Sequence, residues 1–302
     1  MPKIKILVAD EIDISGIRFL SKSKFTVTCK FGISNENILR SYKGYDVLVI
    51  RSIRKIDSKF LDDSFFKTIV TCSKGTDHID KSHAEKKGIA ILNADDSNNI
   101  SAAEHTLGLI LAIHKNILLS DSLVRNKKFT FYNYERSELH GKKIGIIGFG
   151  KVGSLVGKLS NAFGMTVFAN DTDRKVKLKN KDIVFKSCDY ILKNCDIVSI
   201  HIPLENNFHF ISKEKLNLLN KDSVLINTSR GDVIDEKHLL KMLKEKKIKS
   251  AGIDVFSHEP DIDKGFTSLD NVILTNHIAG KTIQSRRKIS DNVFRQIKNL
   301  FG

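Results

Sequence analysis

Three polar side chains follow three separate apolar runs near the C-terminal end of the sequence. The segment "INTSRGD" contains Arg230, "DVFSHEP" contains Glu259 and "LTNHIAG" contains His277. Taken singly, each could serve in a surface ion pair, a helix cap or an ordinary hydrogen bond. Together, a histidine can take the proton of a substrate hydroxyl, a carboxylate can fix its tautomer, and a guanidinium can bind a substrate carboxylate. The set predicts oxidation of a hydroxy acid, which also requires a hydride acceptor.

A binding turn for such an acceptor is indicated by "KKIGIIGFGKVG", residues 142–153. Its glycines have the spacing G-x-G-x-x-G between an apolar strand and a helix. Gly148 permits a tight turn, Gly150 lets the backbone approach a pyrophosphate, and Gly153 lets helix and strand pack closely. The start of the helix offers free N–H groups and its positive end to the phosphates. The pattern therefore predicts a dinucleotide site.

The next strand ends at Asp171, close to the expected spacing of about twenty residues. A carboxylate there can accept hydrogen bonds from both ribose hydroxyls and repels a 2′-phosphate. This favours NAD over NADP, although the nearby Arg174 leaves use of NADP open.

The elements that position these residues form two series of alternating strands and helices. In the first, strands such as "IKILVAD" and "DVLVIRS" alternate with helices expected at 12–21, 35–42, 58–66 and 80–87. The second begins at "KIGIIG" and has helices expected at 152–163, 213–219 and 236–244, with a final helix at about 282–301. Such alternation predicts an α/β fold with two doubly wound parallel sheets.

Between the two series lies "SAAEHTLGLILAIHKNILLSDSLV". Ser101 and Glu104 have the spacing of a capping box, which predicts that a helix begins at Ser101. The helix is apolar on most sides, so we expect it to be buried on more than one face, between domains or between subunits.

Composition narrows the functional class. The 302 residues carry a net charge of +15, but the lysines are scattered and no recognition motif accompanies them, so no nucleic-acid partner is predicted. The longest apolar stretch, 107–119, is too short and too polar to span a membrane, and no signal peptide stands out. We expect a cytoplasmic protein with reduced thiols and no metal site, because its cysteines lack metal-ligand spacing. They are Cys29, Cys72, Cys188 and Cys195.

Over nearly its whole length the chain resembles the D-isomer-specific 2-hydroxyacid dehydrogenases. The matching segments include "ELHGKKIGIIGFGKVG", "CDIVSIHIPL", "LINTSRGDVIDE", "AGIDVFSHEP" and "NVILTNHIAG". The resemblance implies that Arg230 orients the substrate, that His277 is the acid/base and that Glu259 is its partner. It implies NAD as cofactor, bound by Gly148, Gly150, Lys151, Val152, Gly153, Asp171, His201, Pro203, Thr228, Ser229, Asp254 and Gly280.

The resemblance also implies a domain organisation. A Rossmann NAD-binding domain, residues 99–279, is inserted in a flavodoxin-like substrate domain, residues 1–98 and 280–302. The helix from Ser101 would form part of a homodimer interface.

Some positions depart from the family pattern. The usual proline and glycine after "NA" are Asp95 and Asp96, a usual threonine is Phe208, and the common proline before the catalytic histidine is Asn276. The first change concerns the hinge backbone and the second concerns the adenosine pocket. The third, Asn276, leaves the chemistry intact.

The substrate segments are expected to be "IRSIRK" and "CSKGTDHID", with candidate contacts at Arg51, Ser52, Ser73, Lys74, Gly75 and Asn98. Arg51, Arg54 and Lys74 could place three cations around a small anionic 2-hydroxy or 2-keto acid. A phosphate carries nearly two charges and favours such a set. The first prediction is therefore 3-phosphoglycerate, oxidised to 3-phosphooxypyruvate toward serine, as in a short-form D-3-phosphoglycerate dehydrogenase. In the alternative, Arg54 and Lys74 face solvent.

Other functions remain open from the sequence. The same catalytic residues would serve a glyoxylate/hydroxypyruvate reductase or a D-lactate dehydrogenase, and "GTDH" suggests an erythronate-4-phosphate dehydrogenase. A non-catalytic NAD-sensing protein is the candidate from another class. The exact acid, the physiological direction and the oligomer size are not determined by these motifs.

Overall fold

The computed structural model describes residues 2–94, 97–129 and 135–302. The chain divides into two compact units, Met1–Asn98 with Lys281–Gly302, and Asn99–Gly280. Each unit has one sheet in which neighbouring strands are parallel. The predicted α/β class with two doubly wound domains is thus confirmed. Asp95 and Asp96 lie outside the described residues.

The first unit has the strand order β2-β1-β3-β4-β5, which is the flavodoxin-like order. Its strands are β1 Ile4–Val8, β2 Phe25–Cys29, β3 Val47–Ile50, β4 Thr68–Thr71 and β5 Ala90–Asn93. Its helices are α1 Asn35–Ser41, α2 Ser58–Asp62, α3 Lys81–Lys86 and α12 Ile283–Phe301, with a 3₁₀ turn η1 at Ser15–Phe19.

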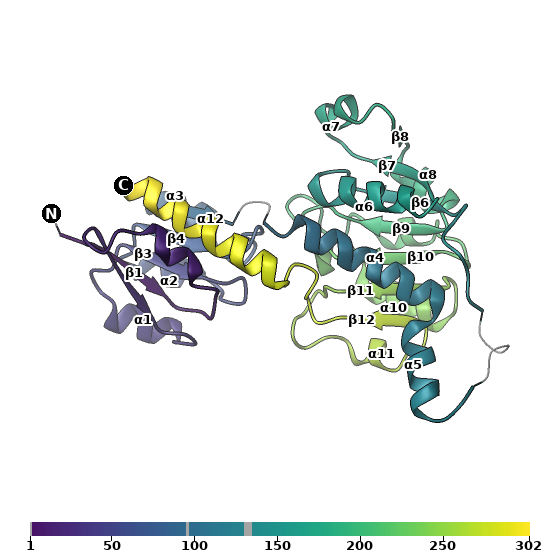
Figure 1. Cartoon of the computed structure of the whole chain (residues 1–302), viewed down its shortest axis with the longest axis horizontal. Coiled ribbons are helices and arrows are strands. Elements are labelled where there is room, and N and C mark those ends of the chain that lie inside the picture. The colour runs from purple at the N-terminus through teal and green to yellow at the C-terminus, as the bar shows by residue number, and fades with distance from the viewer. Residues whose placement is uncertain (1, 95–96, 130–134) are drawn as a thin grey trace. The chain divides into compact units, whose positions relative to one another are not determined.

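The core of this unit lies on both faces of the sheet because successive strand residues point to opposite sides. Ile6 and Val8 of β1 belong to the cluster that includes Phe294 of α12, whereas Leu7 packs with Phe60 of α2. Figure 1 shows α12, drawn in yellow at the chain end, against η1 near the chain start. Both segments of this unit therefore share one hydrophobic core.

The helix expected at 12–21 is wrong in extent, because only the 3₁₀ turn η1 forms there. Gly16 lies directly against α12, and its N–H donates to the Ser290 hydroxyl at 2.9 Å. A Cβ at Gly16 would lie 2.4 Å from the Ser290 carbonyl oxygen. The path of this segment is therefore set by its contact with α12 rather than by local helix propensity.

The second unit has the order β12-β11-β10-β9-β6-β7-β8. Counted from β6, this is the Rossmann order extended by a seventh strand. Its strands are β6 Lys143–Ile147, β7 Thr166–Asn170, β8 Val184–Phe185, β9 Ile197–Ile200, β10 Val224–Asn227, β11 Ser250–Ile253 and β12 Val272–Leu274. Its helices are α4 Asn99–Lys115, α5 Ile117–Arg125, α6 Lys151–Ala162, α7 Arg174–Lys179, α8 Cys188–Asn194, α9 Lys213–Leu216, α10 Glu236–Lys244 and α11 Lys264–Thr267, with a 3₁₀ turn η2 at Gly231–Val233.

Two hydrophobic clusters cover the faces of this sheet. Ile146 packs with Leu107 of α4 and Val156 of α6, whereas the next residue, Ile147, packs with Ile191 of α8. Figure 1 shows α4 and α6 running side by side, in agreement with their contacts. Burial on both faces explains why these strands read as continuous apolar runs.

Helix α4 begins at Asn99, so Ser101 lies inside its first turn and the predicted capping box does not form the start of the helix. The helix ends at Lys115, and Asn116 has a left-handed backbone conformation before α5. No single helix among the described residues has both the length and the apolar character to cross a membrane. Helices α4 and α5 meet those two criteria only as a pair, which is bent by 59°.

Candidate active site

The predicted cofactor and catalytic residues of the second unit follow different strands of one sheet. Gly148 follows β6, Asp171 follows β7, His201 follows β9, Arg230 follows β10 and His277 follows β12. Because these strands are parallel, the five residues lie at the same carboxyl edge. The strand order reverses between β6 and β9, and ligands of open α/β sheets bind at such a switch point.

The glycine turn has the backbone geometry that a dinucleotide requires. Gly148 has φ of 90°, and a Cβ there would lie 2.7 Å from the His201 carbonyl oxygen. A Cβ at Gly153 would lie 2.1 Å from the Gly148 carbonyl oxygen, so neither position tolerates a side chain. Gly150 precedes α6 without a side-chain cap, and a Cβ there would meet nothing within 4 Å.

This arrangement fits an anionic diphosphate. Space lies over the backbone at Gly150, and the uncapped first turn of the twelve-residue helix α6, which contains Lys151 and Val152, offers its N–H groups and positive end. The sequence prediction of a nucleotide-binding turn is therefore compatible with the local structure.

Asp171 is held against this turn. Its Oδ2 accepts a hydrogen bond from the Phe149 N–H at 2.8 Å, and its Oδ1 accepts one from the Asp173 N–H at 2.8 Å. An ionised carboxylate has about four acceptor positions, so both oxygens can still accept from ribose hydroxyls. Asp171 can therefore bind a ribose while it remains fixed to the turn.

His201 lies on the other side of the turn, after β9. Its Nε2 is 2.8 Å from the Ser199 hydroxyl, and burial lowers its pKa to about 4. The imidazole is therefore neutral at physiological pH. Pro203 follows on the same loop, and its carbonyl accepts a hydrogen bond from the Asn207 side chain at 3.0 Å.

The loop after β10 is closed by its own hydrogen bonds. The Asn227 side chain donates to the Arg230 carbonyl at 2.8 Å and accepts from the Ser229 hydroxyl at 2.8 Å. Arg230 Nη1 donates to the Ser229 carbonyl at 2.7 Å, and the Thr228 and Thr106 hydroxyls are 2.9 Å apart. The guanidinium is thus anchored at the carboxyl edge by a rigid loop.

Glu259 and His277 form the central pair of the candidate site. Glu259 Oε2 is 2.8 Å from His277 Nδ1, and Glu259 Oε1 accepts from the Phe256 N–H at 3.0 Å. Because a carboxylate only accepts, Nδ1 carries the hydrogen in the neutral ring and Nε2 keeps its lone pair. The pair is partly open, with side-chain exposures of 38% for His277 and 36% for Glu259. This geometry suits a general base.

The backbone of His277 is held in an unusual conformation. Its φ is 55°, a left-handed value that costs a non-glycine residue of the order of 1–2 kcal/mol. Asp254 accepts from the next two residues, at 2.9 Å from the Ile278 N–H to Oδ1 and 2.9 Å from the Ala279 N–H to Oδ2. These bonds fix the loop on which the imidazole is carried.

A second part of this clamp was not predicted from the sequence. The Thr275 hydroxyl donates to Asp254 Oδ1 at 2.6 Å, and His105 Nε2 of α4 lies 3.1 Å from that hydroxyl. Asp254 is fully buried. The family resemblance implied a cofactor contact for Asp254, which stays a prediction, whereas the structure shows Asp254 holding the loop that carries His277. The only sequence signal for His105 was its place in the "SAAEHT" motif.

The predicted substrate residues lie in the first unit, after β3, β4 and β5. Arg51 is partly buried and its N–H donates to Asp10 Oδ2 at 2.9 Å, while Ser52 and Lys74 are exposed. The Ser73 hydroxyl donates to the Gly75 carbonyl at 2.8 Å, which closes the turn. Asn98 is half-buried before α4, and Gly280 ends the second unit.

Arg54 corrects the prediction of three available cations. Its side chain is only 9% exposed, and Nη2 lies 2.6 Å from Oδ1 of the buried Asp10. Its other donors reach the Asn35 side chain and the Ile33 carbonyl, each at 2.7 Å. Both the expected cation and the expected solvent-facing alternative are therefore wrong for Arg54, which is a structural ion-pair partner.

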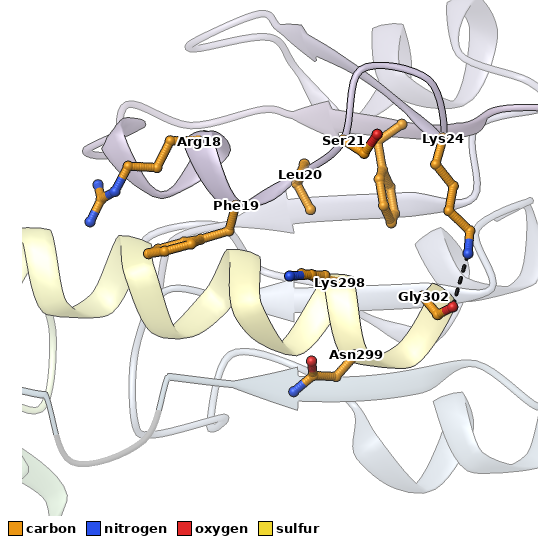
Figure 2. Close-up of a pocket in the computed structure, with 9 residues that line it drawn as sticks. Arg18, Phe19, Leu20, Ser21, Lys24, Lys298, Asn299 and Gly302 are labelled. Carbon is orange, nitrogen blue, oxygen red and sulfur yellow. Dashed lines mark hydrogen bonds between the residues drawn. The ribbon is translucent and has the colours of Figure 1, made fainter.

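A separate hollow of about 720 Å³ lies in the first unit between η1 and the end of α12. Figure 2 shows Lys24 reaching Gly302, whose carbonyl oxygen accepts from Nζ at 2.9 Å. Arg18, Phe19 and Lys298 also line it. None of the predicted site residues belongs to this hollow.

Comparison with known proteins places this site in context. Residues 107–279 match the family model described as D-isomer specific 2-hydroxyacid dehydrogenase, NAD binding domain. D-3-phosphoglycerate dehydrogenase of Methanocaldococcus jannaschii is 34% identical over 98% of the chain, which spans only 57% of that relative's length. Hydroxypyruvate reductase of Thermotoga maritima is 32% identical over 100% of both chains.

The fold has matching solved structures. The D-lactate dehydrogenase of Aquifex aeolicus, solved with NAD and lactic acid, is 26% identical with a TM-score of 0.85. The alignment covers 98% of this chain and 95% of that one.

Proposed function

The chain belongs to the D-isomer-specific 2-hydroxyacid dehydrogenases, which are NAD-dependent oxidoreductases, and on this basis we propose that it interconverts a D-2-hydroxy acid and its 2-keto acid. The observation that carries the proposal is the 2.8 Å contact between His277 and Glu259. The pair lies on the same sheet edge as the glycine turn, and its loop is fixed by a buried carboxylate.

The chain's own residues account for the proton and charge steps. His277 Nε2 takes the hydroxyl proton, and Glu259 stabilises the imidazolium that forms. Arg230 binds the substrate carboxylate and stabilises the developing carbonyl oxygen. NAD, held by the glycine turn and Asp171, would supply the acceptor for the hydride that leaves C2. The reverse direction returns the proton from His277 to the carbonyl oxygen.

We propose 3-phosphoglycerate as the substrate, oxidised to 3-phosphooxypyruvate as the first step toward serine. Arg51 and Lys74 follow neighbouring strands of the first unit and supply cations that suit a phosphate. The relative from Methanocaldococcus jannaschii supports this choice by its name. Asp171 favours NAD over NADP because its carboxylate repels a 2′-phosphate.

A second candidate is the reduction of hydroxypyruvate or glyoxylate. The ion pair of Arg54 with Asp10 removes one of the three expected cations, which weakens the case for a doubly charged group. The hydroxypyruvate reductase of Thermotoga maritima, which aligns with this chain along its entire length, supports the smaller substrate by its name.

The test is NADH absorbance with purified protein and a panel of acids. The panel contains 3-phosphoglycerate, 3-phosphooxypyruvate, hydroxypyruvate, glyoxylate, pyruvate and 4-phosphoerythronate. The proposal expects the highest kcat/KM for the three-carbon phosphorylated pair. A higher kcat/KM for hydroxypyruvate or glyoxylate would select the second candidate. If the protein bound NADH but turned over none of the acids, both candidates would be contradicted and a non-catalytic NAD-sensing protein would remain.

We also propose that the chain forms a homodimer through α5. None of the α5 residues is buried, and Ile117, Leu118 and Val124 are each at least half exposed. Light scattering should give twice the chain mass for the wild type and the chain mass for Leu118→Glu. A monomeric wild type would refute the proposal.

A further inference from the structure

Helix α4 carries two neighbouring polar side chains, a histidine and a threonine, in an otherwise largely apolar stretch. Thr106 is fully buried, and the His105 side chain is 21% exposed. The same helix packs closely on β11, where a Cβ at Gly252 would lie 3.2 Å from the Leu109 Cβ. The partners of the two polar side chains therefore matter, because burying a polar group costs free energy unless it is hydrogen-bonded.

His105 reaches the loop after β12, which carries His277. The Thr275 hydroxyl has one hydrogen, and it donates this hydrogen to Asp254 Oδ1 at 2.6 Å. His105 Nε2, 3.1 Å from the same hydroxyl oxygen, must therefore be the donor in that contact. The helix thus supplies the first donor in a chain of hydrogen bonds. That chain ends on the carboxylate that binds the two residues after His277.

Thr106 reaches the loop after β10, which carries Arg230. Its own hydroxyl hydrogen is donated to the Ala102 carbonyl at 2.8 Å, inside the helix. The Thr228 hydroxyl, 2.9 Å away, must therefore donate to Thr106 Oγ1. The loop that follows Thr228 is closed by the Asn227 side chain, which donates to the Arg230 carbonyl at 2.8 Å. One helix therefore contacts both loops that carry the candidate catalytic side chains.

The two loops are not adjacent in the sheet, because β11 lies between β10 and β12. Successive residues of an α-helix point about 100° apart, so neighbouring side chains can reach two loops that are separated by one strand. A base and a carboxylate-binding cation that act on one small acid must keep a fixed relation to each other. A common support on α4 meets this requirement.

We propose that His105 and Thr106 are positioning residues, which hold the loop of His277 and the loop of Arg230 in a fixed relation to each other. The inference rests on the proposed function and adds to it a role for α4. His105 acts on the acid/base through Thr275 and Asp254. Thr106 acts on the substrate-binding cation through the loop after β10.

Steady-state kinetics with the acid that gives the highest kcat/KM in the wild type tests the proposal. His105→Leu removes the donor and should lower kcat about tenfold, because the base is less well placed. The Kd for NADH should not change, since the glycine turn is untouched. His105→Gln keeps a side-chain N–H at nearly the same reach and should retain most of the wild-type kcat. Thr106→Val should instead raise the KM for the acid about tenfold, because Arg230 binds the substrate carboxylate.

The matched control is His238→Leu on α10. His238 Nε2 lies 2.9 Å from the side-chain oxygen of Asn217, so this variant loses a comparable hydrogen bond on a different helix. It should keep the wild-type kcat and KM. An equal loss of kcat in His105→Leu and His105→Gln would overturn the inference, because it would show that packing of the imidazole matters and its donor does not.

A double-mutant cycle in urea unfolding provides a readout besides activity. The cycle compares the wild type, His105→Leu, Thr275→Val and the double variant. Because both changes remove one contact, the fall in the unfolding midpoint of the double variant should be smaller than the sum of the two single falls. Additive falls, with normal wild-type turnover, would overturn this inference alone. A wild type that turns over no acid would overturn the proposed function and this inference together.

Discussion

At the scale of single residues, the imidazole of His277 is fixed on two sides. Glu259 holds Nδ1 at 2.8 Å, and the backbone of the next two residues is bound by Asp254. The ring therefore cannot rotate away without breaking the contact to Glu259. This restraint is what the proposed role of His277 as a base requires of a partly exposed side chain.

We expect His277→Ala to lower kcat by about 10²- to 10⁴-fold, the usual contribution of general acid–base catalysis. The Kd for NADH should remain near the wild-type value, because the glycine turn is untouched. Steady-state kinetics and NADH fluorescence measure the two quantities. Glu259→Gln should give a smaller loss, and near-normal turnover in His277→Ala would contradict the assignment.

The buried His114 and the partly buried His201 predict how stability depends on pH. Burial, with smaller contributions from Lys142 and Lys249, lowers the pKa of His114 to about 4, and burial alone does so for His201. The ordinary value is 6.5. Because the unfolded chain binds these protons at higher pH, stability is retained above about pH 6.5 and falls as the pH decreases toward 4.

Urea unfolding between pH 7 and pH 4 measures this effect. Each group should contribute a slope of up to about 1.4 kcal/mol per pH unit within that window. His114→Gln cannot be protonated, so its slope should be smaller by the contribution of one group. An unchanged slope in this variant would show that His114 is not the group responsible.

At the scale of elements, the loop between β12 and α12 is positioned by contacts with β11 and α4. Thr275 connects the two, since its hydroxyl donates to Asp254 and lies 3.1 Å from His105. The loop that carries His277 thus contacts a helix that begins far earlier in the chain.

We expect Thr275→Val to destabilise the protein by about 1–3 kcal/mol, because Asp254 loses a hydrogen-bond donor while it stays buried. The looser loop should lower kcat by about tenfold with little change in the Kd for NADH. Urea unfolding, kinetics and NADH fluorescence provide the readouts.

The matched control is Thr267→Val on α11, where the hydroxyl donates only to the Lys264 carbonyl among the described contacts. This variant should keep wild-type kcat. Equal losses in the two variants would argue against a specific role for the clamp.

At the scale of the whole molecule, the excess of positive charge bears on the rate of substrate capture. The chain has 50 Lys and Arg residues against 35 Asp and Glu residues. A positive surface attracts an anionic acid over long distances, and salt screens that attraction.

We expect kcat/KM to fall as ionic strength rises from about 0.01 M to about 1 M, over which the Debye length shrinks from about 30 Å to about 3 Å. The decrease should be steeper for a phosphorylated acid than for pyruvate, because the former carries more charge. Steady-state kinetics at increasing sodium chloride concentration measures the change in kcat/KM. An equal decrease for the two acids would contradict stronger electrostatic attraction of the phosphorylated acid.

The sequence alone determined the features that depend on local patterns. Alternating apolar runs predicted the parallel sheets, and the spacing of Gly148, Gly150 and Gly153 predicted the turn, because a tight turn between a strand and a helix needs glycine at these fixed positions. The placement of Arg230 and His277 at one edge also follows from parallel strands, whose carboxyl ends meet.

Only the tertiary structure decided which partners the polar side chains have. Arg54 is neutralised by Asp10, 44 positions away, and His105 reaches Thr275, 170 positions away. Local periodicity carries no information about such pairs, since they are set by how strands and helices pack. The same reason explains η1, where contact of Gly16 with α12 overrides the expected helix.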